Sequence, residues 1–136
     1  MSMLLDTNVV SELRKRRSDP AVTTWYASTR AGDLHLSVLV VGEMRSGIER
    51  LARHDKEQAA RHEKWLVDLL DLFEDRIMPV TIEVAEVWGR ISVPDPMPAI
   101  DGLLAATALV HDWTLVTRNV RDVRRTGVRL LNPFAD

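Results

Sequence analysis

The sequence predicts a three-layer α/β domain, in which a mostly parallel sheet of about five strands lies between helices. Short apolar runs alternate along the chain with longer segments whose apolar residues recur at helical spacing. Strands that are separated by helices pair in parallel, because a parallel connection needs a crossover. A length of 136 residues, 46% of them hydrophobic, suits one domain with its own core. We therefore expect residues 1–136 to form a single domain.

The N-terminal half is predicted to contain two strands and four helices. Asp19 and Pro20 are typical of a helix start, since Asp is a favoured N-cap and Pro fits the first turn. Ser37 is a candidate N-cap for the next helix, and the charged connection 54–56 separates that helix from a fourth. The expected strands span residues 3–5 and 34–36, and the expected helices span residues 7–14, 20–30, 38–53 and 57–73.

The C-terminal half is predicted to contain three more strands and three more helices. Residues 92–98 hold three prolines and are expected to form a loop, because proline cannot continue a helix or a paired strand. Gly127 marks a turn before the last strand. The expected strands span residues 76–80, 113–117 and 128–131, and the expected helices span residues 81–91, 99–112 and 120–125.

The composition excludes several classes of protein. The chain has no cysteine, which excludes disulfides, thiolate metal sites and a cysteine nucleophile and suits a reducing compartment. We find no signal peptide, and the longest uncharged apolar run, residues 103–110, is too short to cross a bilayer. The four histidines show no ligand spacing, so zinc is not expected. These features predict a cytoplasmic protein without a membrane segment.

Positive charge is concentrated in two places, although the net charge is −2. One is the run at residues 14–17, and the other is the group of arginines at positions 118, 121, 124, 125 and 129. Such groups are often solvated helix ends and loops. Beside an acidic site they would instead favour a nucleic-acid substrate that is held by its phosphate backbone.

Acidic residues fall repeatedly at the edge of the sheet where the strands have their carboxyl ends. Asp6 follows the first strand, Glu43 lies early in the helix after the second, and Asp101 opens the helix after the proline loop. Asn119 and Asp122 follow the fourth strand. Any one of these acids could simply cap a helix or complement its dipole.

Convergence of these acids indicates a cation. Two carboxylates about 5 Å apart repel by roughly 3 kcal/mol at an effective dielectric near 20, so a fold rarely gathers several without a counter-ion. Oxygen ligands suit Mg²⁺ or Mn²⁺, which activate water for hydrolysis of phosphodiester bonds. No G-x-S-x-G, G-x-x-x-x-G-K-[ST] or G-x-G-x-x-G motif offers another chemistry.

Four segments resemble a known family: LLDTNVVSEL, SVLVVGEMRSGIERL, AIDGLLAATALVHDWTLVTRNVRDV and GVRLLNPF. In this order they resemble PIN-domain proteins, and more narrowly the VapC-type toxin ribonucleases in the branch that includes FitB. The resemblance covers essentially the whole chain and implies a Rossmann-like sheet with an acidic centre. It further implies a metal-dependent endoribonuclease that is the toxin of a toxin–antitoxin pair.

The resemblance also implies roles for individual residues. Asp6, Glu43 and Asp101 correspond to the metal-binding acids, and the fourth comes from the T-R-N-x-x-D segment, where we favour Asp122 over Asn119. Asn119 is then a supporting polar residue or a ligand that acts through a water molecule. The remaining expectations are a carboxylate or water contact for Thr7, the same or a helix cap for Ser37, and phosphate contacts or surface ion pairs for Arg45 and Arg118.

The expected partners follow from the same resemblance. They are an RNA substrate, a cognate antitoxin of the VapB or FitA type, operator DNA only through that antitoxin, and a second copy of the chain in a homodimer. Two alternatives remain open: a haloacid-dehalogenase-like phosphatase and a non-catalytic binding module of the same fold. The phosphatase normally needs D-x-D after its first strand, and Asn8 occupies the place of the second aspartate.

Overall fold

The computed structural model describes residues 1–135 and contains a five-stranded sheet in which every pair of neighbours is parallel. The spatial order is β3-β2-β1-β4-β5, so the chain first builds outward from β1 on one side and then returns to its other side. The predicted α/β class is confirmed. The strands are β1 (Met3–Leu5), β2 (Leu34–Ser37), β3 (Ile77–Met78), β4 (Thr114–Val116) and β5 (Arg129–Leu131).

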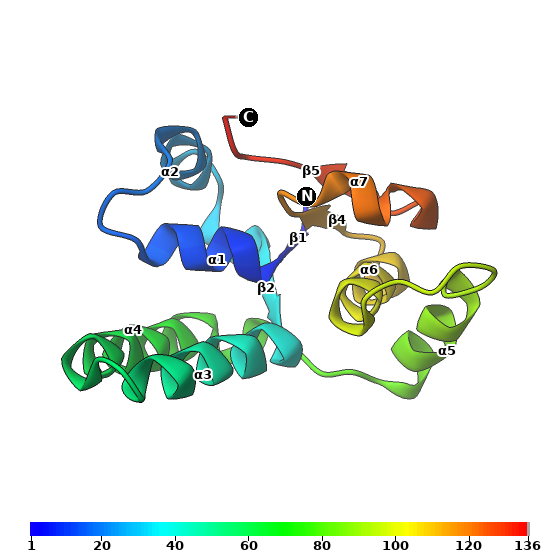
Figure 1. The fold of residues 1–136 in the computed structure, drawn as a ribbon. Coiled ribbons are helices and arrows are strands. Elements are labelled where there is room, and N and C mark those ends of the chain that lie inside the picture. The colour runs from blue at the N-terminus through cyan, green and yellow to red at the C-terminus, as the bar shows by residue number, and fades with distance from the viewer. Residues whose placement is uncertain (136) are drawn as a thin grey trace.

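Seven α-helices within the described residues cover both faces of this sheet, which gives the three layers that the sequence predicts. Figure 1 shows α1 to α4 on one side of the strands and α5 to α7 on the other. None of them, within residues 1–135, is long and apolar enough to cross a membrane. The helices are α1 (Thr7–Arg14), α2 (Pro20–Ala27), α3 (Val38–Ala52), α4 (Lys56–Phe73), α5 (Ile82–Ile91), α6 (Ala99–His111) and α7 (Val120–Val123).

Two predicted boundaries are wrong because neighbouring groups compete for the backbone. Helix α2 ends at Ala27, not near residue 30, since the hydroxyls of Ser28 and Thr29 both donate to the Trp25 carbonyl oxygen at its end. Strand β3 is two residues long, not five, because Met78 pairs with Ser37, the last residue of β2, and the next residue, Pro79, has no backbone N–H to donate. Among residues 1–135, no strand pairs with the chain directly beyond Met78.

The last predicted helix is also shorter than expected. Helix α7 ends at Val123 and continues as a 3₁₀ turn, Arg124–Thr126. Gly127 then adopts a φ of 81°, a left-handed conformation that glycine reaches without steric cost. The chain can therefore reverse tightly into β5, as the position of Gly127 in the sequence predicts.

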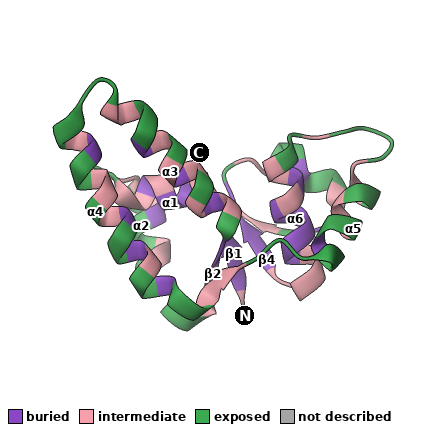
Figure 2. Ribbon diagram, turned by 90° about the horizontal axis from the view of Figure 1, so that it is seen from below, coloured by how far each residue is buried: buried purple, intermediate pink, exposed green. Residues whose placement is uncertain are grey.

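The core lies between the sheet and the helices that flank it, and Figure 2 shows the buried residues on the strands and on the inward faces of the helices. Leu4, Leu36 and Leu115 from three adjacent strands are fully buried. Helix α6 buries mostly small residues, among them Ala105, so that it can approach the strands closely. Burial of these apolar groups contributes about 25 cal/mol per Å² and stabilises the packing of the helices on the sheet.

Helix α6 also approaches α5 closely at Gly102. A Cβ atom at this position would lie 2.9 Å from Cδ1 of Trp88 and 3.2 Å from Cγ of Met97. We expect Gly102→Ala to lower the free energy of unfolding by about 1–3 kcal/mol, because the indole must move in a packed interface. Urea denaturation measures the change.

The matched control for this prediction is Gly89→Ala on the exposed face of α5, where an added Cβ meets no atom of the described residues within 4 Å. We expect it to raise the stability by about 0.5–1 kcal/mol, the ordinary gain of alanine over glycine in a helix. If Gly102→Ala were equally stabilising, the close packing of α5 on α6 would impose no constraint.

Candidate active site

The candidate site lies where the order of the strands reverses, between β1 and β4, at the carboxyl ends of the strands. In open α/β sheets this crevice is where ligands bind. Asp6 directly follows β1, and its backbone N–H donates to the Val116 carbonyl oxygen at 2.9 Å. Thr117 directly follows β4, so the pairing of Leu5 with Val116 brings Asp6 and Thr117 side by side.

Asp6 is the buried centre of the site, with 7% of its surface exposed. Its Oδ2 accepts from the Thr117 hydroxyl at 2.7 Å and from Nδ2 of Asn8 at 3.3 Å, and its Oδ1 accepts from the Thr7 backbone N–H at 2.7 Å. The last bond makes Asp6 the N-cap of α1, so this residue has the capping role that the sequence also allowed, besides its place among the acids. Burial raises the pKa of Asp6, and the hydrogen bonds from Thr117 and Thr7 oppose this effect only in part.

Glu43 reaches the site from the second turn of α3. This helix begins at Ser37, whose hydroxyl accepts from the Leu39 backbone N–H at 3.0 Å. Glu43 lies on the half-buried boundary of the helix, and its Oε1 accepts a short hydrogen bond from the Thr7 hydroxyl. The predicted carboxylate contact of Thr7 is therefore present. Thr7 connects the two acids, because its N–H faces Asp6 and its hydroxyl faces Glu43.

Asp101 enters from the opposite side of the sheet, in the first turn of α6. Its Oδ2 accepts from Nδ2 of Asn119 at 3.3 Å. Burial raises the pKa of Asp101, and the charges of Glu43 and Asp122 raise it further. Asp122 is exposed on α7, and its charge is one of those that raise the pKa of Asp101. Asn119 is thus the residue in direct contact with Asp101, while Asp122 acts on it through space.

The predicted acids lie in one neighbourhood, and their charges act on one another. Asp101 and Glu43 both raise the pKa of Asp6, and Glu43 also raises the pKa of Asp101. As the side chains stand, no three acidic or imidazole groups within residues 1–135 are arranged to hold a metal ion. The carboxylates of Asp6, Glu43 and Asp101 accept instead from local donors, which are Thr117, Thr7 and Asn119 respectively. The set offers hard oxygen donors and unbalanced negative charge, which suits a divalent cation.

Three predicted contributors have other contacts. Ser37 is the N-cap of α3, so the cap alternative is the one that the structure shows. Arg45 forms a bidentate ion pair with Glu63 at 2.5 and 2.8 Å, which is the surface alternative to a phosphate contact. The guanidinium of Arg118 lies over the ring of Phe134 at 4.6 Å, and its phosphate contact stays a prediction.

Two residues of the site have no assigned role in the sequence-based prediction. Thr117 donates to Asp6, and its Oγ1 accepts from the Asn119 backbone N–H at 3.0 Å. Asn8 donates to both Asp6 and Thr117 and accepts from the Arg118 backbone N–H. Asn8 belongs to the D-T-N motif and Thr117 to the T-R-N motif, so membership of these motifs could have indicated that both residues belong to the site.

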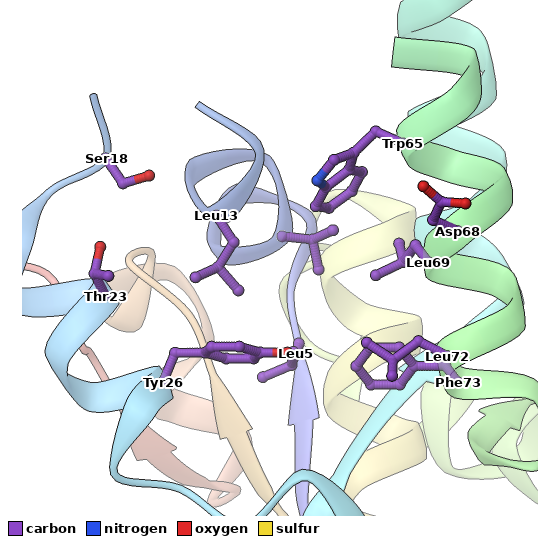
Figure 3. A pocket seen from close by; sticks show the side chains of 11 residues that line it. Leu5, Leu13, Ser18, Thr23, Tyr26, Trp65, Asp68, Leu69, Leu72 and Phe73 are labelled. Carbon is purple, nitrogen blue, oxygen red and sulfur yellow. The ribbon is translucent and has the colours of Figure 1, made fainter. Parts of the chain in front are cut away.

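An apolar groove of about 350 Å³ lies between α1, α2 and α4. In Figure 3 the side chains of Leu13, Tyr26, Trp65 and Leu69 point toward one another from these three helices. Leu72 lies on the rim of the groove and is 55% exposed. An apolar hollow of this kind on a surface is typical of a binding site for another molecule.

The fold and the acidic centre together define a doubly wound α/β protein with a candidate cation site at its switch point. Residues 3–128 match the family model of the PIN domain. The chain belongs to the PIN-domain family, as its motifs predict. This membership removes the haloacid-dehalogenase alternative.

Named relatives and solved structures agree with this assignment. The chain is 33% identical over 139 residues to Toxin FitB of Neisseria gonorrhoeae, an alignment that covers 98% of this chain and 99% of the relative. It is 26% identical to the VapC ribonuclease Y4jK of Sinorhizobium fredii, over 97% of each chain. A solved structure of FitAB bound to an IR36 DNA fragment matches with a TM-score of 0.86 and 34% identity, over 96% of this chain and 94% of that one.

Proposed function

We propose that this chain is a metal-dependent endoribonuclease and the toxin component of a toxin–antitoxin pair. The observation that carries the proposal is the convergence of Asp6, Glu43 and Asp101 at the switch point of the sheet, where their charges act on one another. The similarity to proteins named Toxin FitB and VapC ribonuclease supports the same activity. All the acids of the motif are present, which favours an enzyme over a non-catalytic binding module.

The residues of the site divide into ligands and positioning groups. Asp6, Glu43 and Asp101 would hold Mg²⁺ or Mn²⁺, with Asp122 as the fourth acid. The bound ion would supply Lewis-acid stabilisation of phosphate charge and a water of lowered pKa. Thr117 and Thr7 orient the carboxylates of Asp6 and Glu43 through the hydrogen bonds described above. Asn119 does the same for Asp101.

The test is cleavage of RNA by the purified chain. We expect cleavage of single-stranded RNA with Mg²⁺ or Mn²⁺, its loss with EDTA, and no hydrolysis of small phosphate monoesters. Mapping of the cut sites after brief expression identifies the RNA. Inert RNA in the presence of either metal would contradict the proposed activity and favour the binding module.

The groove supplies a place for a protein partner. We propose that the cognate antitoxin, of the VapB or FitA type, lays an apolar segment along Leu13, Tyr26 and Trp65. The solved relative FitAB, bound to DNA, supports a partner of this kind. We also propose that operator DNA is bound only through the antitoxin, that the chain forms a homodimer, and that it acts in the cytoplasm.

A further inference from the structure

A basic hollow of about 640 Å³ lies between the C-terminal end of α1 and the first half of α4, away from the acidic centre. It is lined by Arg14, Arg16, Gln58, Arg61, His62 and Trp65. The lining contains three guanidinium groups and no carboxylate. The chain as a whole is slightly acidic, with a net charge of −2, so this positive potential is local.

The cations of this hollow are not neutralised within the described part of the chain. Elsewhere Lys15, Lys64, Arg90 and Arg129 each form an ion pair with a nearby carboxylate. Within residues 1–135 no such pair is formed by the three arginines of the hollow. In the described part of the chain these three charges therefore have no carboxylate counter-ion.

Two of these groups are also partly withdrawn from water. Arg14 is half-buried, and burial lowers its pKa. His62 has its pKa lowered by burial and by the charges of Arg14 and Arg61. A half-buried guanidinium without a carboxylate partner costs free energy that a bound anion would recover.

We propose that this hollow binds the phosphate backbone of the RNA substrate at a distance from the bond that is cut, an inference that rests on the proposed function. Guanidinium groups match phosphate oxygens with paired hydrogen bonds. The half-buried Trp65 offers a ring on which a base can stack, which is how proteins commonly hold single strands. The volume also exceeds what a single carboxylate would fill.

Helix α1 sets the separation between this hollow and the acidic centre. Asp6 caps its N-terminus and Arg14 is its last residue. The eight residues of the helix extend about 12 Å at 1.5 Å per residue. This length corresponds to roughly three or four stacked nucleotides at about 3.4 Å each. The hollow would therefore select RNA that extends beyond the scissile bond over very short fragments.

An acidic protein segment is the competing occupant, because Trp65 also lines the apolar groove. The linings argue against a single occupant. The groove is mainly apolar and its one charged lining residue is Asp68, whereas every lining residue of the hollow except Trp65 is basic or polar. We therefore assign the hollow to nucleic acid.

The test measures binding separately from cleavage. A labelled single-stranded RNA oligonucleotide is titrated, without metal, against the Asp101→Asn protein, in which cleavage is expected to be strongly reduced, and binding is followed by fluorescence anisotropy. We expect Arg61→Ala and Arg14→Gln together to weaken binding about tenfold or more, the value of one charge-assisted contact. The salt dependence of the affinity should fall by about 0.7 per lost phosphate contact. Arg90→Ala, which removes an exposed charge on α5, is the control and should change neither.

The possible outcomes separate this proposal from the proposed function. Unchanged RNA affinity in the double variant, with an intact circular dichroism spectrum, would overturn the proposal even if the wild type cleaves RNA. The same holds if the double variant loses affinity only for a glutamate-rich peptide. A wild-type protein that binds RNA through these arginines but never cleaves it would instead contradict the proposed activity and support RNA binding by the hollow.

Discussion

Asp101→Asn is expected to reduce metal-dependent RNA cleavage by about a hundredfold or more, the effect of removing one group that stabilises charge in a transition state. Asparagine keeps the acceptor oxygen for Asn119 but removes the negative charge next to Glu43 and Asp122. The binding of Mg²⁺ or Mn²⁺ should weaken with it. The measurements are the initial rate of cleavage and the metal-induced shift in the melting temperature.

The metal-free form of this variant should be no less stable than the wild type. The pKa of Asp101 is raised in the folded chain, so the folded state holds this proton more tightly than the unfolded state. The charged carboxylate therefore opposes folding increasingly as the pH rises from the ordinary pKa of aspartate through this raised pKa. Asparagine removes this dependence. A variant that is inactive only because it has unfolded would contradict the prediction.

The matched control is Asp71→Asn on the exposed face of α4, outside the cluster of acids. It removes the same charge and should leave both cleavage and the metal-induced stabilisation unchanged. If Asp101→Asn cleaved RNA at the wild-type rate, Asp101 would have to be removed from the set of proposed ligands.

Leu72→Asp is expected to weaken binding of the cognate antitoxin by about thirtyfold or more, corresponding to roughly 2 kcal/mol, because it places a charge against an apolar partner segment. The side chain is 55% exposed on the rim of the groove, so the substitution places a charge in the binding surface without burying it in the core. Cells that produce both proteins should then be arrested in growth. Calorimetry on the purified pair gives the affinity directly.

Val67→Asp provides the comparison for this variant. Val67 lies on the same helix, is 48% exposed and does not line the groove. It should bind the antitoxin as the wild type does and should remain neutralised by it. Equal binding by both variants would assign the antitoxin to another face, while RNA cleavage by Leu72→Asp should be retained in either case.

The sequence was most informative where local pattern and sheet geometry agree. Asp6, Glu43 and Asp101 were predicted to converge because each follows a strand or opens a helix at the same edge of a parallel sheet. The third strand shows the limit of such reasoning. Residues 76–80 were predicted as one strand, but only Ile77 and Met78 are paired, since β2 ends at Ser37 and Pro79 has no backbone N–H to donate.

Side-chain partners that lie far apart in the sequence were beyond prediction. Thr117 donates to Asp6 across 111 residues, and Arg45 pairs with Glu63 on the next helix. Both pairs depend on how two elements pack, and a local pattern of residues does not encode that packing. The same holds for the basic hollow, of which the sequence indicated only the basic run at residues 14–17.

By itself, then, the sequence determined the α/β class, the order of the elements and the edge on which the acids gather, because alternating strands and helices permit few other arrangements. The tertiary structure alone decided which donors hold each carboxylate, which arginines are already paired, and where α1 and α4 enclose a groove and a hollow. Those features arise from the relative positions of helices, which are fixed by the packing of their buried faces.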